Sequence, residues 1–253
     1  MNHDIFVLSE VHLCKTKNKI SSEKYITRFC IKCSTHIEPK SIPLTENTID
    51  YDSDGDLNTN RTEFDNNAIT LTIIHCNSTH LNNVGKQVWA ASLLMADYII
   101  YSDVFKDCYC IELGAGVGIC SILASFKASH VFSTDKENDI LCLNQENYEL
   151  NCFMRYYFQY NSEFSWIDKD CLVIEKTNII IAADCIYDEE KRLNFSIEEL
   201  DVSSPSYEHF RNLLHCYSSS NNISITNIPL DFPIFVDYER SSYLELWRID
   251  IFK

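Results

Sequence analysis

The sequence predicts an α/β fold, in which a parallel sheet is covered by helices on both faces and follows an irregular N-terminal extension. From residue 84 onward, short apolar strands alternate with helical segments, the order that a parallel sheet requires. The length of 253 residues leaves room for one domain of enzyme size with an appendage. We therefore divide the chain into an N-terminal extension with an acidic linker, residues 1–83, and an α/β domain, residues 84–253.

Composition excludes several classes of protein. Hydrophobic residues make up 45% of the chain and charged residues 23%, which is typical of a globular protein and not of a disordered one. No apolar run reaches the ~18 residues of a membrane-spanning helix, and Met1–Asp4 does not begin a secretory signal. Twelve cysteines without such a signal indicate reduced thiols in the nucleus, the cytoplasm or both.

The chain carries 21 basic and 37 acidic residues, a net charge of −16. This balance argues against direct binding of nucleic acid or a membrane, because both need a surplus of lysine and arginine. The acidity would attract a basic protein partner. Alternatively it only keeps the protein soluble, and charge alone does not separate the two explanations.

The N-terminal extension contains a strand pattern and two motifs that resemble metal sites. Ile69–Ile73 alternates apolar and polar residues, as a half-buried strand does. The aspartates of Asp50–Asp56 have the alternate spacing of a calcium loop, but the glycine falls one place early. Cys30–His36 offers two cysteines and a histidine, but no second ligand pair follows. We therefore predict a solvated acidic linker and no metal site.

The α/β domain is expected to begin with a helix at Val88–Ile100 that is apolar on nearly all sides and therefore buried against the sheet. A buried strand at Cys108–Leu113 follows, and Gly114–Gly118 turns from it into an apolar helix at Ile119–Phe126. The other expected elements are the strands His130–Thr134 and Asn178–Ala183, the helices Ile140–Leu150 and Pro205–Tyr217, and a C-terminal antiparallel hairpin of Pro233–Tyr238 with Tyr243–Ile251.

Three of the five glycines, Gly114, Gly116 and Gly118, lie in the turn after the first buried strand. They let the backbone approach a ligand closely, and the following helix points its free N–H groups toward that ligand. Their spacing differs from the Gly-x-Gly-x-x-Gly of dinucleotide enzymes, which disfavours a nicotinamide oxidoreductase. The preceding Glu112 would repel a pyrophosphate but suits a cation. S-adenosyl-L-methionine, with a sulfonium and an ammonium group, is such a ligand.

Further polar residues follow two other strands of the domain. Asp135 ends the second strand, where a carboxylate can accept the hydroxyl groups of a ribose. Alternatively it caps the helical stretch that begins at Lys136. Asp184 and Tyr187 follow Asn178–Ala183, and ligands bind where parallel strands end. This carboxylate and phenol could position a substrate amine and help to remove its proton, or Asp184 could simply end the strand in a turn.

Four motifs lie at the places where such a ligand would bind, namely Val84–Trp89, Glu112–Gly118, Ser133–Asp135 and Asp184–Tyr187. Together they resemble the seven-β-strand, family 16 protein lysine methyltransferases. Further stretches, from Val7–Leu13 to Leu244–Trp247, extend the resemblance over most of the chain. The resemblance implies a Rossmann-like seven-strand sheet, S-adenosyl-L-methionine as methyl donor and a lysine as acceptor. We also expect a monomer that acts on a basic, nucleic-acid-associated protein of the nucleus.

The resemblance assigns a role to each candidate residue. Asp184 and Tyr187 are the catalytic candidates, because they would flank the channel that the target lysine enters. A lysine must lose its proton before it accepts a methyl group, and a pocket that desolvates it lowers its pKa. Catalysis then rests mainly on positioning in a dry site. The cofactor-binding candidates are Trp89, Glu112, Gly114, Gly116, Gly118 and Asp135.

The chain departs from the family at two places. In the family an acidic residue and a tryptophan contact the adenine, but Trp166 here follows Ser165, so we expect Trp166 in the apolar cover of the sheet. After Tyr187 a parallel sheet needs a crossover of about a dozen residues or more. The chain instead runs at once into Glu190–Phe195, which in the family lies beyond the next strand. One helix and one strand are therefore expected to be lacking.

This missing segment suggests a hypothesis about the sequence and a second function. A skipped exon or a faulty gene model would explain the abrupt join. If the chain exists as written, sheet edges that are normally covered become exposed. The alternative function is a methyltransferase-fold interaction module that no longer transfers methyl groups.

Overall fold

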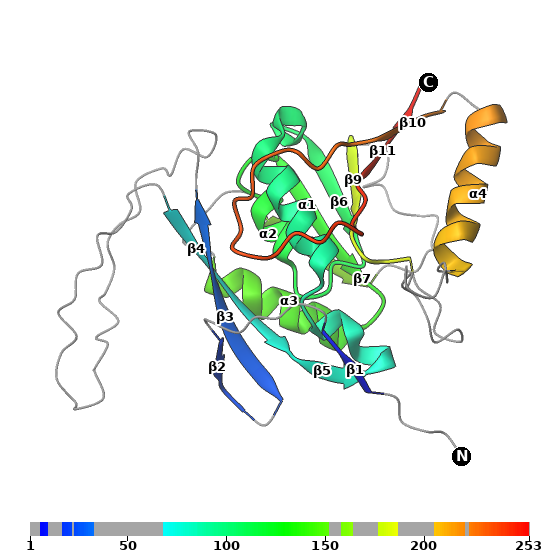
Figure 1. Cartoon of the computed structure of the whole chain (residues 1–253). Coiled ribbons are helices and arrows are strands. Elements are labelled where there is room, and N and C mark those ends of the chain that lie inside the picture. The colour runs from blue at the N-terminus through cyan, green and yellow to red at the C-terminus, as the bar shows by residue number, and fades with distance from the viewer. Residues whose placement is uncertain are drawn as a thin grey trace, which may run out of the picture.

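The computed structural model describes residues 6–9, 17–21, 23–32, 68–151, 158–163, 177–186, 205–220 and 223–252 (Figure 1). Its centre is a four-stranded parallel sheet of order β8-β7-β6-β9. Strands β6, β7 and β8 follow one another toward one edge, and β9 lies on the other side of β6, which confirms the predicted Rossmann-like α/β fold. The strands are β6 (Tyr109–Leu113), β7 (His130–Asp135), β8 (Phe158–Glu163) and β9 (Ile179–Ala182).

The helices lie where the sequence predicts them, with ends shifted by a turn or less. α1 buries side chains on several sides, as expected from its apolar sequence, and packs against α2, whose residues are all buried. α3 is amphipathic and packs on β7 and β8. The helices are α1 (Ala90–Tyr101), α2 (Ile119–Ala124), α3 (Asn138–Leu150) and α4 (Pro205–Ser220), with short 3-10 helices η1 (Leu81–Lys86) and η2 (Asp103–Phe105).

The N-terminal part is more regular than the expected extension. β3 (Lys24–Lys32) and β4 (Ala68–Cys76) pair antiparallel along their full lengths, and β2 (Lys17–Lys19) pairs with β3. A separate short pair joins β1 (Phe6–Leu8) to β5 (Ser78–His80). The β3–β4 hairpin crosses in front of α3 in Figure 1.

The hairpin contributes to the same hydrophobic core as the α/β domain. Phe29 and Ile31 of β3 and Leu71 of β4 are buried in one cluster with Val88 and with Leu93 of α1. Alternating residues of β3 face solvent, which is the pattern of a strand with one covered face. The division of the chain at residues 83 and 84 stays a prediction, but buried side chains on its two sides form one core.

Some expected features cannot be compared with the structure. Cys30 is exposed on β3, whereas the other motif positions lie outside the described residues. Within the part of the chain that the structure describes, no group of three His, Cys, Asp or Glu side chains could hold a metal ion. Its helices are also too short or too polar to cross a membrane. The positions outside the described residues are Cys33, His36, Asp50–Asp56, Ser165, Trp166, Tyr187 and Glu190–Phe195.

The predicted C-terminal hairpin is wrong in one of its strands. β11 (Trp247–Ile251) pairs antiparallel with β10 (Ile223–Asn227), and not with Pro233–Tyr238. The reason is a long-range contact, because the Asp97 carboxylate accepts the N–H groups of Phe235 and Val236 at 2.8 and 2.9 Å. These groups are then not free to form a regular strand ladder. Val236 instead forms an isolated bridge with Ile31 of β3.

An internal ion pair holds this C-terminal loop against α1. The Arg240 guanidinium donates to the Asp97 carboxylate at 2.7 Å and to the carbonyl oxygens of Leu230 and Phe232, both at 2.8 Å. It also lies 4.4 Å from the centre of the Phe232 ring. Burial raises the pKa of the Asp97 carboxyl above its usual value, although Arg240 and two N–H groups act against this. The loop thereby joins α1 and the N-terminal hairpin in one body.

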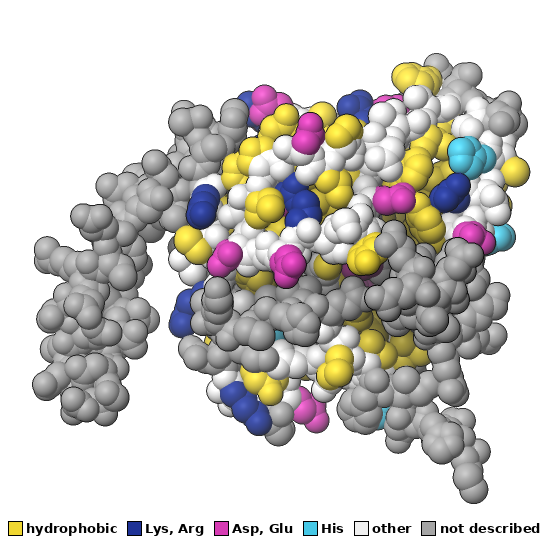
Figure 2. Space-filling model, in the orientation of Figure 1, with side chains coloured by type: hydrophobic (Ala, Val, Ile, Leu, Met, Phe, Trp, Pro, Cys, Tyr) yellow, Lys and Arg dark blue, Asp and Glu magenta, His cyan; other side chains and the backbone are white. Residues whose placement is uncertain are grey.

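β9 forms one edge of the parallel sheet within the described residues. Its Ile180 side chain is 59% exposed, although strands of parallel sheets usually have both faces covered. Hydrophobic side chains also reach the surface beside α4 (Figure 2), and Leu213, Tyr217, Ile249 and Ile251 are among the exposed ones. This edge is where the sequence predicts the lack of one helix and one strand.

Candidate functional site

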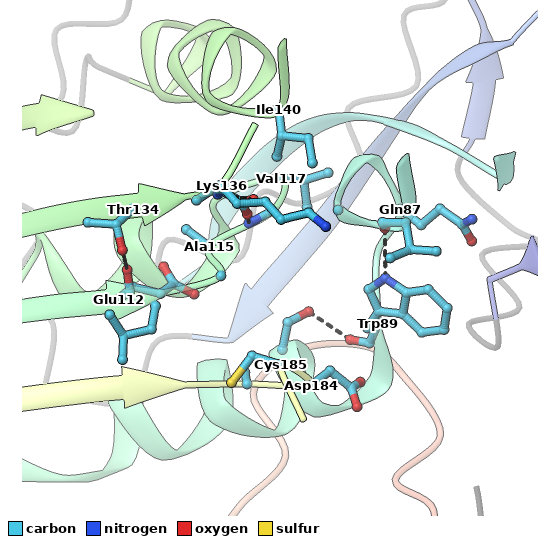
Figure 3. A pocket seen from close by; sticks show the side chains of 18 of the residues that line it. Gln87, Trp89, Glu112, Ala115, Val117, Thr134, Lys136, Ile140, Asp184 and Cys185 are labelled. Carbon is cyan, nitrogen blue, oxygen red and sulfur yellow. Dashed lines mark hydrogen bonds between the residues drawn. The ribbon is translucent and has the colours of Figure 1, made fainter. Parts of the chain in front are cut away.

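A cavity opens at the carboxyl ends of β6, β7 and β9, where the strand order changes direction. Ligands of open α/β sheets bind at this kind of position. Figure 3 shows Asp184 and Cys185 on one side of the cavity and Lys136 and Ile140 on the other. Most of the lining residues come from η1 and the loop after it, the glycine turn Gly114–Gly118, the ends of β6 and β7, and the residues after β9. The helices add Ser92 of α1, Ile119 of α2 and Ile140 of α3.

The glycine turn has a backbone that other residues would not tolerate. Gly114, Gly116 and Gly118 have φ angles of +64°, +53° and +89°, in the left-handed region that favours glycine. A Cβ on Gly116 would lie 2.8 Å from the carbonyl oxygen of Gly85, and one on Gly118 would lie 2.7 Å from Nδ2 of Asn144. The backbone of Gly85 and the Asn144 side chain of α3 therefore pack closely against the turn. Other atoms of the turn line the cavity.

Glu112 ends the buried part of β6 and lines the cavity, as expected for a residue that meets a cation. Its side chain is only 2% exposed, and the Ser121 hydroxyl donates a hydrogen bond to its carboxylate. Thr134 of β7 donates to the Glu112 carbonyl oxygen at 2.7 Å, which fixes the neighbouring strand end (Figure 3). Burial raises the pKa of the Glu112 carboxyl to about 7. A cation brought next to this carboxyl would favour its ionised form.

Asp135, the last residue of β7, contacts the middle of the glycine turn. One carboxylate oxygen accepts the Gly116 N–H at 3.0 Å, and the other accepts the Lys136 N–H at 2.8 Å. Each oxygen keeps a second lone pair that can accept a hydroxyl group. The alternative role as helix cap is wrong, because the N-cap of α3 is Glu137. The helix begins two residues too late for Asp135 to cap it.

Asp184 follows β9 and contacts the start of α1. Its φ angle of +55° lies in the left-handed region, which is uncommon for a residue other than glycine. One carboxylate oxygen accepts the Ala91 N–H at 3.3 Å, and the N-terminus of a helix stabilises a nearby negative charge. Strained backbone of this kind is often found at functional sites. Tyr187, its predicted catalytic partner, lies outside the described residues.

Trp89 lines the cavity next to the start of α1. Its indole N–H donates to the Val84 carbonyl oxygen at 2.9 Å, so the ring is held by η1 (Figure 3). The Ser92 hydroxyl donates to the Trp89 carbonyl oxygen at 2.7 Å and fixes the first turn of the helix. The structure therefore brings Trp89, Glu112, the three glycines, Asp135 and Asp184 to one cavity.

The sequence analysis missed residues that shape the same cavity. Gly85 packs between α3 and the glycine turn, and a Cβ at this position would lie 2.7 Å from Cδ1 of Ile140. Glycine is rare in this chain, and this rarity could have drawn attention to Gly85, which is one of only five glycines. Lys136 and Cys185 also line the cavity. Cys185 lies within the motif Asp184–Tyr187 and Lys136 directly follows Ser133–Asp135, so their positions beside these motifs were the available signal.

Comparisons with known proteins bear on this site. The model of the lysine methyltransferase family matches residues 67–224. The chain is 32% identical to methyltransferase-like protein 22 of Homo sapiens over 230 residues, which cover 71% of this chain and 57% of the human protein. It is 30% identical to methyltransferase-like protein 22 of Mus musculus over 230 residues, 71% of this chain and 58% of the mouse protein. The chain thus spans a little more than half the length of these relatives.

The alignments also bear on the segment that we expect to be missing. They extend over 230 positions, yet 71% of a chain of 253 residues is fewer residues than that. The aligned region of each relative therefore includes positions without a counterpart in this chain. This is in agreement with an internal segment that the relatives have and this chain lacks.

Proposed function

Because the chain belongs to the lysine methyltransferase family, we propose that it transfers a methyl group from S-adenosyl-L-methionine to a lysine side chain of a basic protein. One observation carries the proposal. A glycine turn with three left-handed glycines shares a cavity with Glu112, Asp135 and Asp184, which lie at the ends of three neighbouring parallel strands. A cationic nucleoside ligand needs this combination of close backbone approach and negative charge.

The residues of the cavity fit the methyl donor part by part. The glycine turn borders the cavity with backbone that carries no side chains at three positions, and Glu112 offers a buried carboxyl to the ammonium or sulfonium group. Asp135 would hold the ribose hydroxyl groups through its remaining lone pairs, and Trp89 would cover one side of the ligand. When bound, S-adenosyl-L-methionine supplies an electrophilic methyl group on its sulfonium.

On the acceptor side, this chain must hold a lysine amine and take up its proton. The Ala91 N–H donates to the Asp184 carboxylate and holds it at the start of α1, where it would accept a hydrogen bond from the amine. A partly closed cavity disfavours the charged ammonium form and so promotes loss of the proton. We assign Tyr187 to the same channel by its position three residues further along the chain.

The partner and the place of action are part of the same proposal. A net charge of −16 supports a basic protein as substrate, because opposite charges speed the encounter of the two molecules. We propose a nucleic-acid-associated protein in the nucleus or the cytoplasm, with the chain acting as a monomer. Tritiated methyl transfer to nuclear and cytoplasmic protein extracts, separated by charge, tests this part. Labelling confined to acidic proteins would contradict it.

Substitution of Asp184 tests the catalytic assignment. Asp184→Asn keeps a side chain that tolerates the left-handed backbone and keeps an acceptor for the Ala91 N–H. We expect methyl transfer to fall by about 100-fold with unchanged affinity for S-adenosylhomocysteine, measured by calorimetry. Asp103→Asn, at an exposed position of η2 outside the cavity, is the matched control and should keep full activity. Equal labelling by wild type and Asp184→Asn would remove this carboxylate from the mechanism.

Two observations favour the interaction module as a second candidate. The exposed edge at β9 and the unmatched positions of the relatives both suit a chain that lacks part of its sheet. Calorimetry and thermal unfolding with S-adenosyl-L-methionine separate the two functions, because the module needs no donor. If S-adenosyl-L-methionine produces neither heat of binding nor a shift in melting temperature, the interaction module is the remaining function. Sequencing of full-length transcripts tests whether the segment is missing in the organism itself.

A further inference from the structure

α3 carries three buried asparagines on the side that faces away from solvent. Asn144, Asn147 and Asn151 follow the i, i+3, i+7 spacing of one helix face, and their exposed fractions are 0%, 0% and 3%. Burial of an amide is unfavourable unless its hydrogen bonds are replaced within the protein. The burial of these three side chains therefore has to be explained by their hydrogen-bond partners within the protein.

Two of the amides bind the outer edge of β4 in the manner of a neighbouring strand. Asn151 accepts the Thr72 N–H at 3.0 Å and donates to the Thr72 carbonyl oxygen at 2.8 Å. Asn147 accepts the Ile74 N–H at 2.6 Å and donates to the Ile74 carbonyl oxygen at 2.9 Å. In the described residues β4 has a strand neighbour only in β3, so the two amides satisfy the open side of an edge strand.

The same row of amides reaches the glycine turn at its other end. Asn147 also donates to the Val117 carbonyl oxygen at 2.9 Å. Asn144 donates to the Gly116 carbonyl oxygen at 3.2 Å and to the Ser133 hydroxyl at 3.0 Å. Asn147 thus joins the β4 backbone to the turn through one side chain, whereas Asn151 touches only β4 and α3.

We propose that Asn144 and Asn147 are positioning residues of the methyl-donor site, and that through Asn147 the N-terminal hairpin sets how tightly the glycine turn binds its ligand. The identity of the ligand rests on the proposed function. A peptide group is planar, so holding the carbonyl of Gly116 or Val117 also fixes the direction of the N–H that follows it. A turn with three glycines has many conformations when free, and restricting them before binding lowers the entropic cost of binding.

This coupling acts in both directions. A ligand that orders the turn must, by linkage, also stabilise the contact between Asn147 and β4. Binding at the cavity should therefore slow amide hydrogen exchange at Ile74, which lies on the hairpin and does not line the cavity. This readout uses the wild-type chain and does not depend on a variant that folds.

Three single substitutions in the full chain separate positioning from plain stability. Asn151→Ala loses contacts to β4 and to the Asn147 carbonyl oxygen but none to the turn, Asn144→Ala loses contacts on the side of the turn only, and Asn147→Ala loses contacts to both β4 and the turn. Calorimetry with S-adenosylhomocysteine should show affinity lowered about tenfold or more in Asn144→Ala and Asn147→Ala, and changed less than about twofold in Asn151→Ala. Melting temperatures of all three should fall, which makes Asn151→Ala the control for stability.

Hydrogen exchange in the ligand-free proteins gives a second readout. Exchange at Ala115, Gly116 and Gly118 should accelerate in Asn144→Ala and Asn147→Ala, whereas Asn151→Ala should accelerate exchange at Thr72 alone. Equal affinities in Asn147→Ala and Asn151→Ala, or unchanged exchange in the turn of Asn147→Ala, would overturn the inference. If wild type binds no S-adenosylhomocysteine, the proposed function fails, and exchange in the turn still decides whether the asparagines position it.

Discussion

Glu112 is a buried carboxyl of the candidate site with a strongly shifted pKa. Burial raises its pKa from 4.5 to about 7. A carboxyl whose pKa is higher in the folded than in the unfolded protein costs stability once it ionises, so the cost grows above pH 4.5 and levels off above pH 7. We expect Glu112→Gln to raise the free energy of unfolding of the ligand-free protein by up to about 3 kcal/mol at pH 8 and by little at pH 4.5. Urea unfolding at the two pH values measures this difference, and a larger gain at the lower pH would contradict it.

The same carboxyl should make donor binding depend on pH. A bound cation favours the ionised form of Glu112, so binding releases a proton and weakens as the pH falls from 8 to 6. Calorimetry in buffers of different ionisation enthalpy measures the released proton directly. Glu112→Gln should bind S-adenosyl-L-methionine more weakly and show no such pH dependence. A proton release that survives this substitution would place the titrating group elsewhere.

At the scale of elements, the glycine turn can be tested against a matched glycine outside it. A Cβ on Gly116 would meet the Gly85 carbonyl oxygen and would also force a side chain onto a φ of +53°. We expect Gly116→Ala to destabilise the protein by about 1–2 kcal/mol for the left-handed backbone alone and to abolish donor binding. Gly85→Ala meets the Ile140 side chain, with Cδ1 nearest, and needs no left-handed backbone, so it should be milder. Thermal unfolding measures the stability of both variants, and calorimetry measures their donor binding. Equal losses of stability and of binding in the two variants would contradict this ranking.

The elements also show which parts of the fold local sequence could predict. β6, the glycine turn and α1 follow from apolar patterns within their own residues, and the sequence analysis placed them correctly. The pairing of β10 with β11 could not be predicted in this way, because Asp97 withdraws Phe235 and Val236 from the expected strand across 138 and 139 positions of sequence. β3 was not predicted, although its buried residues Phe29 and Ile31 alternate with exposed ones as in a strand with one covered face.

For the whole molecule, the candidate site was predictable where it depends on topology. Parallel strands all end at one edge of their sheet, so Glu112, Asp135 and Asp184 had to lie close together once the strands were identified. The amides beneath the turn were not predictable, because Asn147 acquires its role only when α3 packs on β4. An asparagine on a helix is ordinarily a surface residue, and its sequence neighbours give no sign of burial.

The integrity of the whole molecule should depend on the ion pair between Arg240 and Asp97. Removal of Arg240 leaves a fully buried carboxyl with two N–H donors but no counter-charge. We expect Arg240→Ala to lower the free energy of unfolding by about 3–5 kcal/mol, whereas Arg248→Ala, which breaks an exposed pair with Asp250, should cost less than about 1 kcal/mol. Because burial already raises the pKa of Asp97, the loss in Arg240→Ala should deepen as the pH rises and the carboxyl ionises. Urea unfolding of both variants at pH 5 and pH 8 tests this, and a loss that is larger at pH 5 would mean that packing, and not charge, holds the C-terminal loop.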